Sequence, residues 1–173
     1  WRFGWHPEKI KKKKSPKRFL VVGAGPSGLE AARVLGEQGN KVILAEATRN
    51  LGGRVIKESN LLGLAEWRRV SDWRITQINK LPNIEIYRES ELVANDVTEL
   101  NVDFVMIATG AKWAEDAVGR HSDTGFETTD KNMIIGAERI LNGEKIDAEC
   151  IVIYDDDHYY IGSVMALELA KRG

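Results

Sequence analysis

Three glycines near the start of the chain restrict its fold more than any other feature. They lie in the stretch "VVGAGPSG" as Gly23, Gly25 and Gly28, with the spacing G-x-G-x-x-G. An apolar run at 18–22 precedes them, apolar residues at helical spacing follow them, and a second apolar run occupies 41–46. This order predicts a strand, a glycine turn, a helix and a second strand parallel to the first.

Each glycine of this pattern has its own physical task. Gly23 permits the tight turn, Gly25 allows a pyrophosphate to approach the backbone, and Gly28 lets the helix pack closely on the strand. The free N–H groups at the helix start then attract an anion. Glu46 ends the second strand 18 residues after Gly28, where its carboxylate can accept hydrogen bonds from both ribose hydroxyls of an adenosine. A negative charge there disfavours a 2′-phosphate, so the pattern predicts an ADP moiety rather than NADP.

The remaining sequence predicts an α/β fold. Strands are expected at 84–87, 102–110 and 149–154, with a short helix within 136–143 and a longer one from 161 onwards. Residues 63–81 are expected to form a helix with an apolar side, to which we assign Trp67, Val70, Trp73, Ile78 and Leu81. We therefore predict a Rossmann-like domain with a parallel sheet, followed by the first β–α unit of a second such domain.

Composition excludes several classes of function. The chain has 173 residues, 43% of them apolar and 29% charged, with a net charge of −1, so nothing favours a nucleic acid or membrane partner. The basic run at 9–18 is interpreted as a solvated linker, with an acidic docking partner as the alternative. Cys150 is the only cysteine, which fits a reducing cytoplasm and rules out a cysteine-ligated cluster within this chain. Because it begins an apolar run, we expect it to be buried and inert.

Six motifs carry a closer resemblance. They are "GWHPE", "VVGAGPSGLEAARVLGEQG", "LGGRV", "LLGLAEWRRVSDWR", "IATGAKW" and "YDDDHYYIG". Together they resemble the C-terminal nucleotide-binding region of trimethylamine dehydrogenase-like iron–sulfur flavoproteins. This group includes the dimethylamine and histamine dehydrogenases and is related to the 2,4-dienoyl-CoA reductases.

The resemblance implies a longer parent enzyme. An N-terminal barrel outside this chain would carry FMN and a 4Fe-4S cluster and would oxidise an amine. The parent would be a homodimer that passes electrons to a carrier such as an electron-transfer flavoprotein. Residues 1–17 would then be a basic linker from that barrel, 18–147 an ADP- or FAD-binding domain without its return segment, and 148–173 the start of a second, degenerate domain.

The resemblance assigns cofactor binding, but no catalytic residue and no metal ligand, to this chain. The first site would hold ADP as in the amine dehydrogenases, or FAD as in the dienoyl-CoA reductases. The residues assigned to it are Gly23, Ala24, Gly25, Pro26, Ser27, Gly28, Glu46, Ala47, Gly53, Arg54, Thr109 and Gly110.

The second turn, Asp155 to Gly162, departs from the glycine pattern. When it is aligned with the first turn, Gly162 takes the place of Gly28, but Asp157 and Tyr159 replace the other two glycines. A tyrosine would block a pyrophosphate and the aspartates would repel it, so we expect no NAD(P) at this turn. A metal ion held by "DDDH" is disfavoured because consecutive residues do not readily converge on one ion.

Three functions are compatible with this reading. The chain is expected to be the nucleotide-binding segment of an amine dehydrogenase. The alternatives are the FAD-binding part of an NAD(P)H-dependent flavin or enoyl-CoA-type reductase, and a non-catalytic ADP-binding module that offers a docking surface.

Overall fold

A computed structural model of the chain describes residues 9–121, 123–125, 130 and 133–172. The chain forms two compact units. Unit 1 contains residues 1–56 and 68–110, and unit 2 contains residues 57–67 and 111–173. The "GWHPE" motif lies outside the described residues. The domain limits expected from the sequence, at 18–147 and 148–173, stay a prediction.

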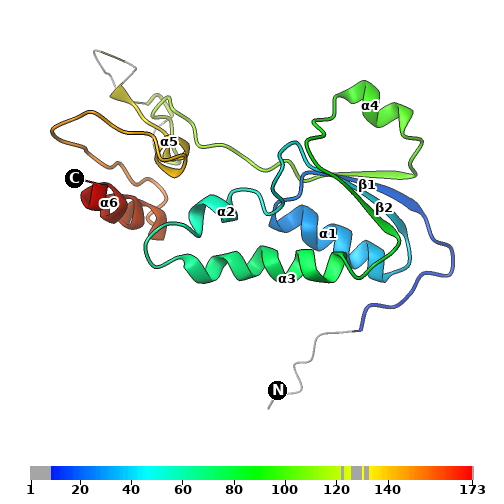
Figure 1. Ribbon diagram of the computed structural model, residues 1–173. Helices are drawn as coiled ribbons and strands as arrows, with labels where there is room; N and C mark the ends of the chain where they lie inside the picture. The colour runs from blue at the N-terminus through cyan, green and yellow to red at the C-terminus, as the bar shows by residue number, and fades with distance from the viewer. Residues whose placement is uncertain (1–8, 122, 126–129, 131–132, 173) are drawn as a thin grey trace. The chain divides into compact units, whose positions relative to one another are not determined.

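Unit 1 is built on a parallel four-stranded sheet (Figure 1). Its strands are β1 (Arg18–Val22), β2 (Lys41–Ala45), β3 (Ile84–Tyr87) and β4 (Phe104–Ile107). The strand order is β3-β2-β1-β4, so β1 pairs in register with β2 on one side and with β4 on the other. The predicted α/β class and parallel sheet are confirmed.

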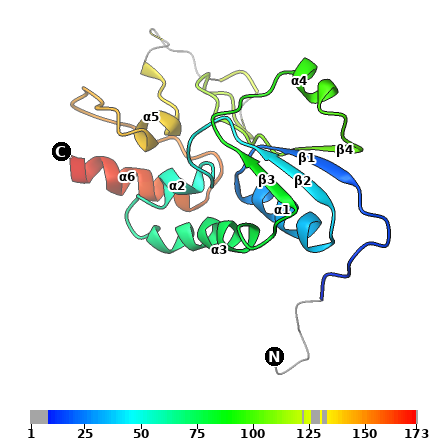
Figure 2. The same cartoon turned by 45° about the vertical axis from the view of Figure 1, so that its right-hand side comes forward.

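Helices cover both faces of this sheet. α1 (Pro26–Glu37) and α3 (Arg68–Ile78) lie together on one face, and the short α4 (Ala94–Glu99) lies on the other (Figure 2). A short helix, α2 (Val55–Glu58), and a 3-10 turn, η1 (Ala65–Trp67), precede α3. Pro26 begins α1 at a position where its missing N–H is no loss, and Gly39 follows the end of the helix with φ +89°.

Alternating strand residues supply the core of unit 1. Val21, Val42 and Leu44 point to the α1 side, where they pack with Leu29 and other buried residues. The intervening Leu20, Ile43 and Ala45 point to the opposite face, beneath α4. Successive side chains of a strand alternate between faces, so both faces of this sheet are buried near its centre.

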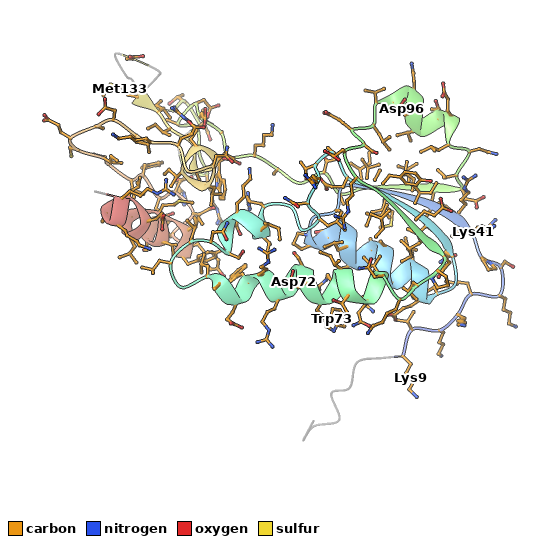
Figure 3. All side chains as sticks on the ribbon, viewed as in Figure 1. Lys9, Lys41, Asp72, Trp73, Asp96 and Met133 are labelled. Carbon is orange, nitrogen blue, oxygen red and sulfur yellow. The ribbon has the colours of Figure 1, made fainter. Side chains whose placement is uncertain are left out.

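Only part of the apolar side expected from the sequence is buried: Ile78 lies in the core as predicted, but Trp67, Val70 and Trp73 are exposed. The buried residues of α3 are Ser71 and Ile78, and Ile75 packs against the same core. These three residues are four and three positions apart, so they lie on one face of the helix. Trp73, predicted to face the core, is 51% exposed and lies against the guanidinium groups of Arg33 and Arg74 (Figure 3). The prediction was wrong for the tryptophans, which were taken for core residues, whereas the small Ser71 is fully buried and lets α3 approach the core of unit 1 closely.

An ion-pair cluster joins α1 to α3. The Glu30 carboxylate accepts hydrogen bonds from Arg33 Nη2 at 2.6 Å and from Arg74 Nε at 2.8 Å. The hydrogen bond from Arg33 is the main cause that lowers the pKa of Glu30, and Arg74 lowers it further. The cluster therefore fixes how α3 lies along α1, although its partly exposed groups contribute little to stability.

Unit 2 has a small core of its own. Leu61, Ile140 and Met165 are its buried centre, supplied in part by α5 (Ala137–Leu141) and α6 (Tyr160–Arg172). Both helices were predicted. The strand predicted at 149–154 is not formed, and Val152 is 87% exposed.

The missing strand has a physical reason. Within the described residues of unit 2 no segment pairs with 149–154, and a β-strand needs a neighbour for its backbone hydrogen bonds. The same cause corrects the expectation for Cys150, which is exposed rather than buried.

Two surface features of unit 1 complete the fold. The outer strand β4 carries four exposed apolar side chains, and Ile107 is 78% exposed. The basic run is tied to the unit through its backbone, since Lys13 N–H donates to Gln38 O and Lys17 N–H to Asn40 Oδ1. None of the described helices is long and apolar enough to span a membrane.

The buried position of Leu29 gives a first testable prediction. Leu29 is 0% exposed, so Leu29→Ala is expected to lower the free energy of unfolding by about 2–5 kcal/mol, through lost burial and a cavity. Leu167→Ala is the matched control, because Leu167 is also helical but 53% exposed, and should cost about 1 kcal/mol or less. Urea unfolding monitored by circular dichroism measures both; equal losses would contradict the described core.

Candidate nucleotide-binding site

The glycine turn between β1 and α1 is closely packed on one side. Gly23 has φ +97°, and a side chain there would collide with the carbonyl of Ala108. A side chain at Gly28 would collide with the carbonyl of Gly23 and lie 3.3 Å from Ala108 Cβ. The first and third glycines are therefore required by the backbone itself, which brings the turn against the chain that follows β4.

Gly25 differs from these two glycines. A Cβ at this position would meet no atom of the described residues within 4 Å, and its φ of −68° and ψ of 179° suit any residue. The fold therefore does not need a glycine here. Open space at the N-cap of α1 is what a phosphate group requires for close approach to the backbone.

The start of α1 is free of competing side chains. Its N-cap makes no side-chain hydrogen bond, its first turn contains no acidic residue, and Leu29 N–H makes the first intrahelical bond, to Gly25 O. Earlier N–H groups of a helix have no intrahelical acceptor. This helix end can thus receive an anion with both its N–H groups and its dipole.

Glu46 is joined to the glycine turn. Its side chain is 8% exposed, and Oε2 accepts the N–H of Ala24 at 2.7 Å. Oε1 accepts from the N–H of Thr48 at 2.9 Å and from Thr48 Oγ1 at 2.8 Å. Three of roughly four acceptor positions of the carboxylate are thereby used. A ribose hydroxyl would bind through the remaining position or by sharing one of these bonds.

The loop after β2 lies directly over the turn. Gly52 N–H donates to Ala24 O at 2.8 Å. Gly53 has φ +58°, and a Cβ on it would lie 2.9 Å from Gly25 Cα. The double glycine therefore allows the "NLGGR" loop to touch the backbone of the glycine turn, which explains two adjacent glycines at this point.

The other predicted site residues surround this centre more loosely. Pro26 is half-buried, and Ser27, Ala47, Arg54 and Thr109 are exposed. Gly110 is also exposed and has φ +77°. These residues follow β1, β2 and β4, and the ends of parallel strands meet at one edge of the sheet. Their role as nucleotide ligands remains a prediction.

Sequence reasoning missed three residues that shape this site. Thr48 orients Glu46, Gly52 holds Ala24, and Ala108 packs under the turn. The Gly-Gly pair could have indicated Gly52, and the motif "IATGAKW" contains Ala108, but Thr48 has no distinctive sequence signal. Beside the loop is a polar hollow of about 320 Å³, lined by Asn50, Leu51, Ile56, Arg68, Asp72, Ile75 and Arg88.

The second turn, in unit 2, is filled with internal hydrogen bonds. Asp156 accepts from the hydroxyl of Tyr154 at 3.1 Å and from the backbone N–H groups of Arg120 and His121. Desolvation acts to raise the pKa of Asp156, but these hydrogen bonds outweigh it and lower the pKa below its usual value. Among the described residues no group of acidic, histidine or cysteine side chains is arranged to hold a metal ion.

Substitutions at Gly28 and Gly25 should differ in their effect on stability. Gly28→Ala is expected to lower the free energy of unfolding by about 1–3 kcal/mol, because its methyl group collides with the turn. Gly25→Ala should change stability by only about 1 kcal/mol or less, because the position is open and its φ is allowed, although alanine is a poorer N-cap than glycine. Chemical unfolding measures both; a loss for Gly25→Ala as large as that for Gly28→Ala would contradict the open space.

Asp156 gives a prediction for pH. Folding lowers the pKa of Asp156, so its ionised carboxylate stabilises unit 2. This stabilisation is complete above the pKa of an aspartate in the unfolded chain, near 4, and it is lost as the pH falls through the lower pKa of the folded state. Asp156→Asn should therefore flatten the loss of stability below about pH 4. Asp157→Asn is the control, since Asp157 is the exposed neighbour of Asp156 in the same turn. Thermal unfolding from pH 2.5 to 6 measures how the midpoint of each variant depends on pH. The same pH dependence for Asp156→Asn and for the unsubstituted chain would refute the prediction.

The sequence matches known proteins over its whole length. Residues 6–146 match the pyridine nucleotide-disulphide oxidoreductase family. Dimethylamine dehydrogenase from Hyphomicrobium sp. (strain x) is 36% identical over 180 aligned positions, which cover 100% of this chain and 24% of that protein.

Two solved structures show the same fold. Histamine dehydrogenase from Rhizobium sp. 4-9 has 45% identity and a TM-score of 0.90, over 98% of this chain and 25% of its own. The 6-hydroxypseudooxynicotine amine oxidase from Pseudomonas geniculata N1 has 40% identity and a TM-score of 0.92, over 98% of this chain and 26% of its own.

The chain spans about a quarter of the length of these relatives. The resemblance drawn from the six motifs is confirmed, because amine dehydrogenases are among the proteins that match. The matched residues include the glycine turn, the double-glycine loop and the strand that precedes Glu46. The chain belongs to the pyridine nucleotide-disulphide oxidoreductase family, and it is similar to dimethylamine dehydrogenase and histamine dehydrogenase.

Proposed function

We propose that this chain is the ADP- or FAD-binding segment of an amine-oxidising flavoprotein. The observation that carries the proposal is the open space at Gly25, at the uncapped start of α1. The two neighbouring glycines are fixed by packing, so Gly25 is the one whose missing side chain serves a ligand. The names of the matching proteins support the reaction class.

The pyrophosphate would lie at the start of α1 and the adenosine ribose at Glu46. The backbone N–H groups of the helix start would hold the phosphate charge. The polar hollow beside the loop, which contains Asn50 and Arg88, follows the ends of β2 and β3 and offers room for the adenosine end. When bound, FAD would supply redox chemistry, whereas ADP would be redox-inert and would stabilise the fold.

Catalysis would take place outside this chain. FMN and a 4Fe-4S cluster would belong to a barrel elsewhere in the parent protein, and Cys150 alone cannot ligate such a cluster. The parent would pass its electrons to a carrier such as an electron-transfer flavoprotein. It would act in the cytoplasm as a homodimer.

A second candidate is the FAD-binding part of an NAD(P)H-dependent reductase. The family description, which names pyridine nucleotides, favours this candidate. The filled second turn disfavours it, because Asp155, Asp156 and Asp157 place negative charge where a nicotinamide nucleotide would need an anion site.

The proposal is tested by measuring which nucleotide the protein binds. Denaturation followed by mass analysis identifies a co-purified nucleotide, and calorimetry then measures affinity for ADP and FAD. Gly25→Ala should weaken binding by about tenfold or more, or about 1.4 kcal/mol, while stability changes by about 1 kcal/mol or less. Released ADP supports the amine dehydrogenase reading, and released FAD supports the reductase. A folded protein with no affinity for ADP or FAD would refute the site.

A further inference from the structure

The hydroxyl group of Thr48 has two acceptors within reach. Thr48 Oγ1 lies 2.8 Å from Glu46 Oε1 and 3.0 Å from the backbone oxygen of Asn50. A threonine hydroxyl carries one proton, and its oxygen can also accept hydrogen bonds. Thr48 therefore donates either to the carboxylate or to the carbonyl. While it donates to Asn50, its oxygen can accept a hydrogen bond from a ligand.

The two oxygens of the Glu46 carboxylate have different surroundings. Oε2 accepts the N–H of Ala24, which is 0% exposed. Oε1 bonds to Thr48, which is exposed, so Oε1 is the oxygen on the side that a ligand can reach. It accepts the N–H of Thr48 at 2.9 Å. When the Thr48 hydroxyl donates to Asn50, Oε1 therefore has one acceptor position left.

Glu46 Oε1 and Thr48 Oγ1 together match the neighbouring hydroxyls of a ribose. The two oxygens are 2.8 Å apart. The 2′- and 3′-hydroxyls of a ribose lie on the same side of the ring, within hydrogen-bond distance of each other, so each can donate to one of these oxygens. A carboxylate oxygen and a hydroxyl oxygen whose proton is directed elsewhere are both acceptors.

The backbone at Thr48 is held without help from the hydroxyl. Thr48 O accepts the N–H of Glu89 at 3.2 Å, and Glu46 O accepts the N–H of Ser90 at 2.9 Å. The segment after β2 is thereby tied to the segment after β3. We expect a variant without the hydroxyl to keep this backbone, so that the hydroxyl can be tested by itself.

We propose that Thr48 binds the adenosine ribose together with Glu46. Glu46 Oε1 accepts one ribose hydroxyl, Thr48 Oγ1 accepts the other, and the Thr48 proton turns to the Asn50 carbonyl. The exchange leaves neither Oε1 nor the Thr48 hydroxyl without a partner. This inference rests on the function proposed above. It adds that the site selects a ribose with both hydroxyls over a deoxyribose.

Two nucleotides and two variants of Thr48 test the inference. Calorimetry measures the affinity of the 173-residue chain, freed of any co-purified nucleotide, for ADP and for 2′,3′-dideoxy-ADP. Thr48→Val keeps the shape of the side chain without its hydroxyl. It should weaken ADP binding about three- to tenfold, as expected for one hydrogen bond, and change dideoxy-ADP binding by less than about twofold. Thr48→Ser keeps the hydroxyl and should restore the affinity for ADP.

Thr98→Val is the matched control. Thr98 is also exposed, and its hydroxyl donates to Asn95 O at 2.7 Å, but it lies in α4, away from the glycine turn. This variant should bind both nucleotides as the unsubstituted chain does. Urea unfolding shows that each variant is folded.

The pattern of affinities separates the outcomes. A loss for ADP alone in Thr48→Val, with recovery in Thr48→Ser, supports the inference. Equal losses for both nucleotides would show a structural role for Thr48 and would overturn it, as would an unchanged affinity for ADP. Equal binding of ADP and dideoxy-ADP by the unsubstituted chain would overturn it without any variant. In each of these cases the proposed function stands, whereas a folded chain that binds neither nucleotide would refute both.

Discussion

The conformation of unit 1 around the glycine turn depends on the two backbone hydrogen bonds of Ala24. Its N–H is held by the Glu46 carboxylate at 2.7 Å and its carbonyl by the N–H of Gly52 at 2.8 Å. The residue is fully buried, so losing either partner would leave a buried polar group unsatisfied, at a cost of about 1–3 kcal/mol. One residue thereby ties the end of β1 to the end of β2 and to the loop that follows it.

This arrangement links stability to binding. Glu46 was expected to be a ligand for ribose, but its first task in the structure is to hold the glycine turn. Loss of its carboxylate would therefore disturb the fold as well as any nucleotide. Gly25 is free of this ambiguity, since none of the described residues occupies the space beside it. It is the better position at which to examine binding alone.

The sequence predicted the features that depend on local geometry. The glycine spacing, the strand before it and the helix after it were found as expected, because each reflects a backbone requirement within a few residues. Features that depend on distant partners were not predictable. Thr48 and Ala108 act through tertiary contacts. Trp73 lies against two arginines rather than in the core, and residues 149–154 lack the neighbour that a strand needs.

The outer strand of the sheet has a practical consequence. β4 lies at the edge of the sheet and carries four exposed apolar residues, of which Ile107 is the most accessible. An edge of this kind offers unpaired backbone groups and apolar side chains to any other extended chain. Concentrated solutions of this chain would therefore self-associate through β4. Lysine or proline on the outward side of that strand is the substitution by which natural sheets avoid such aggregation.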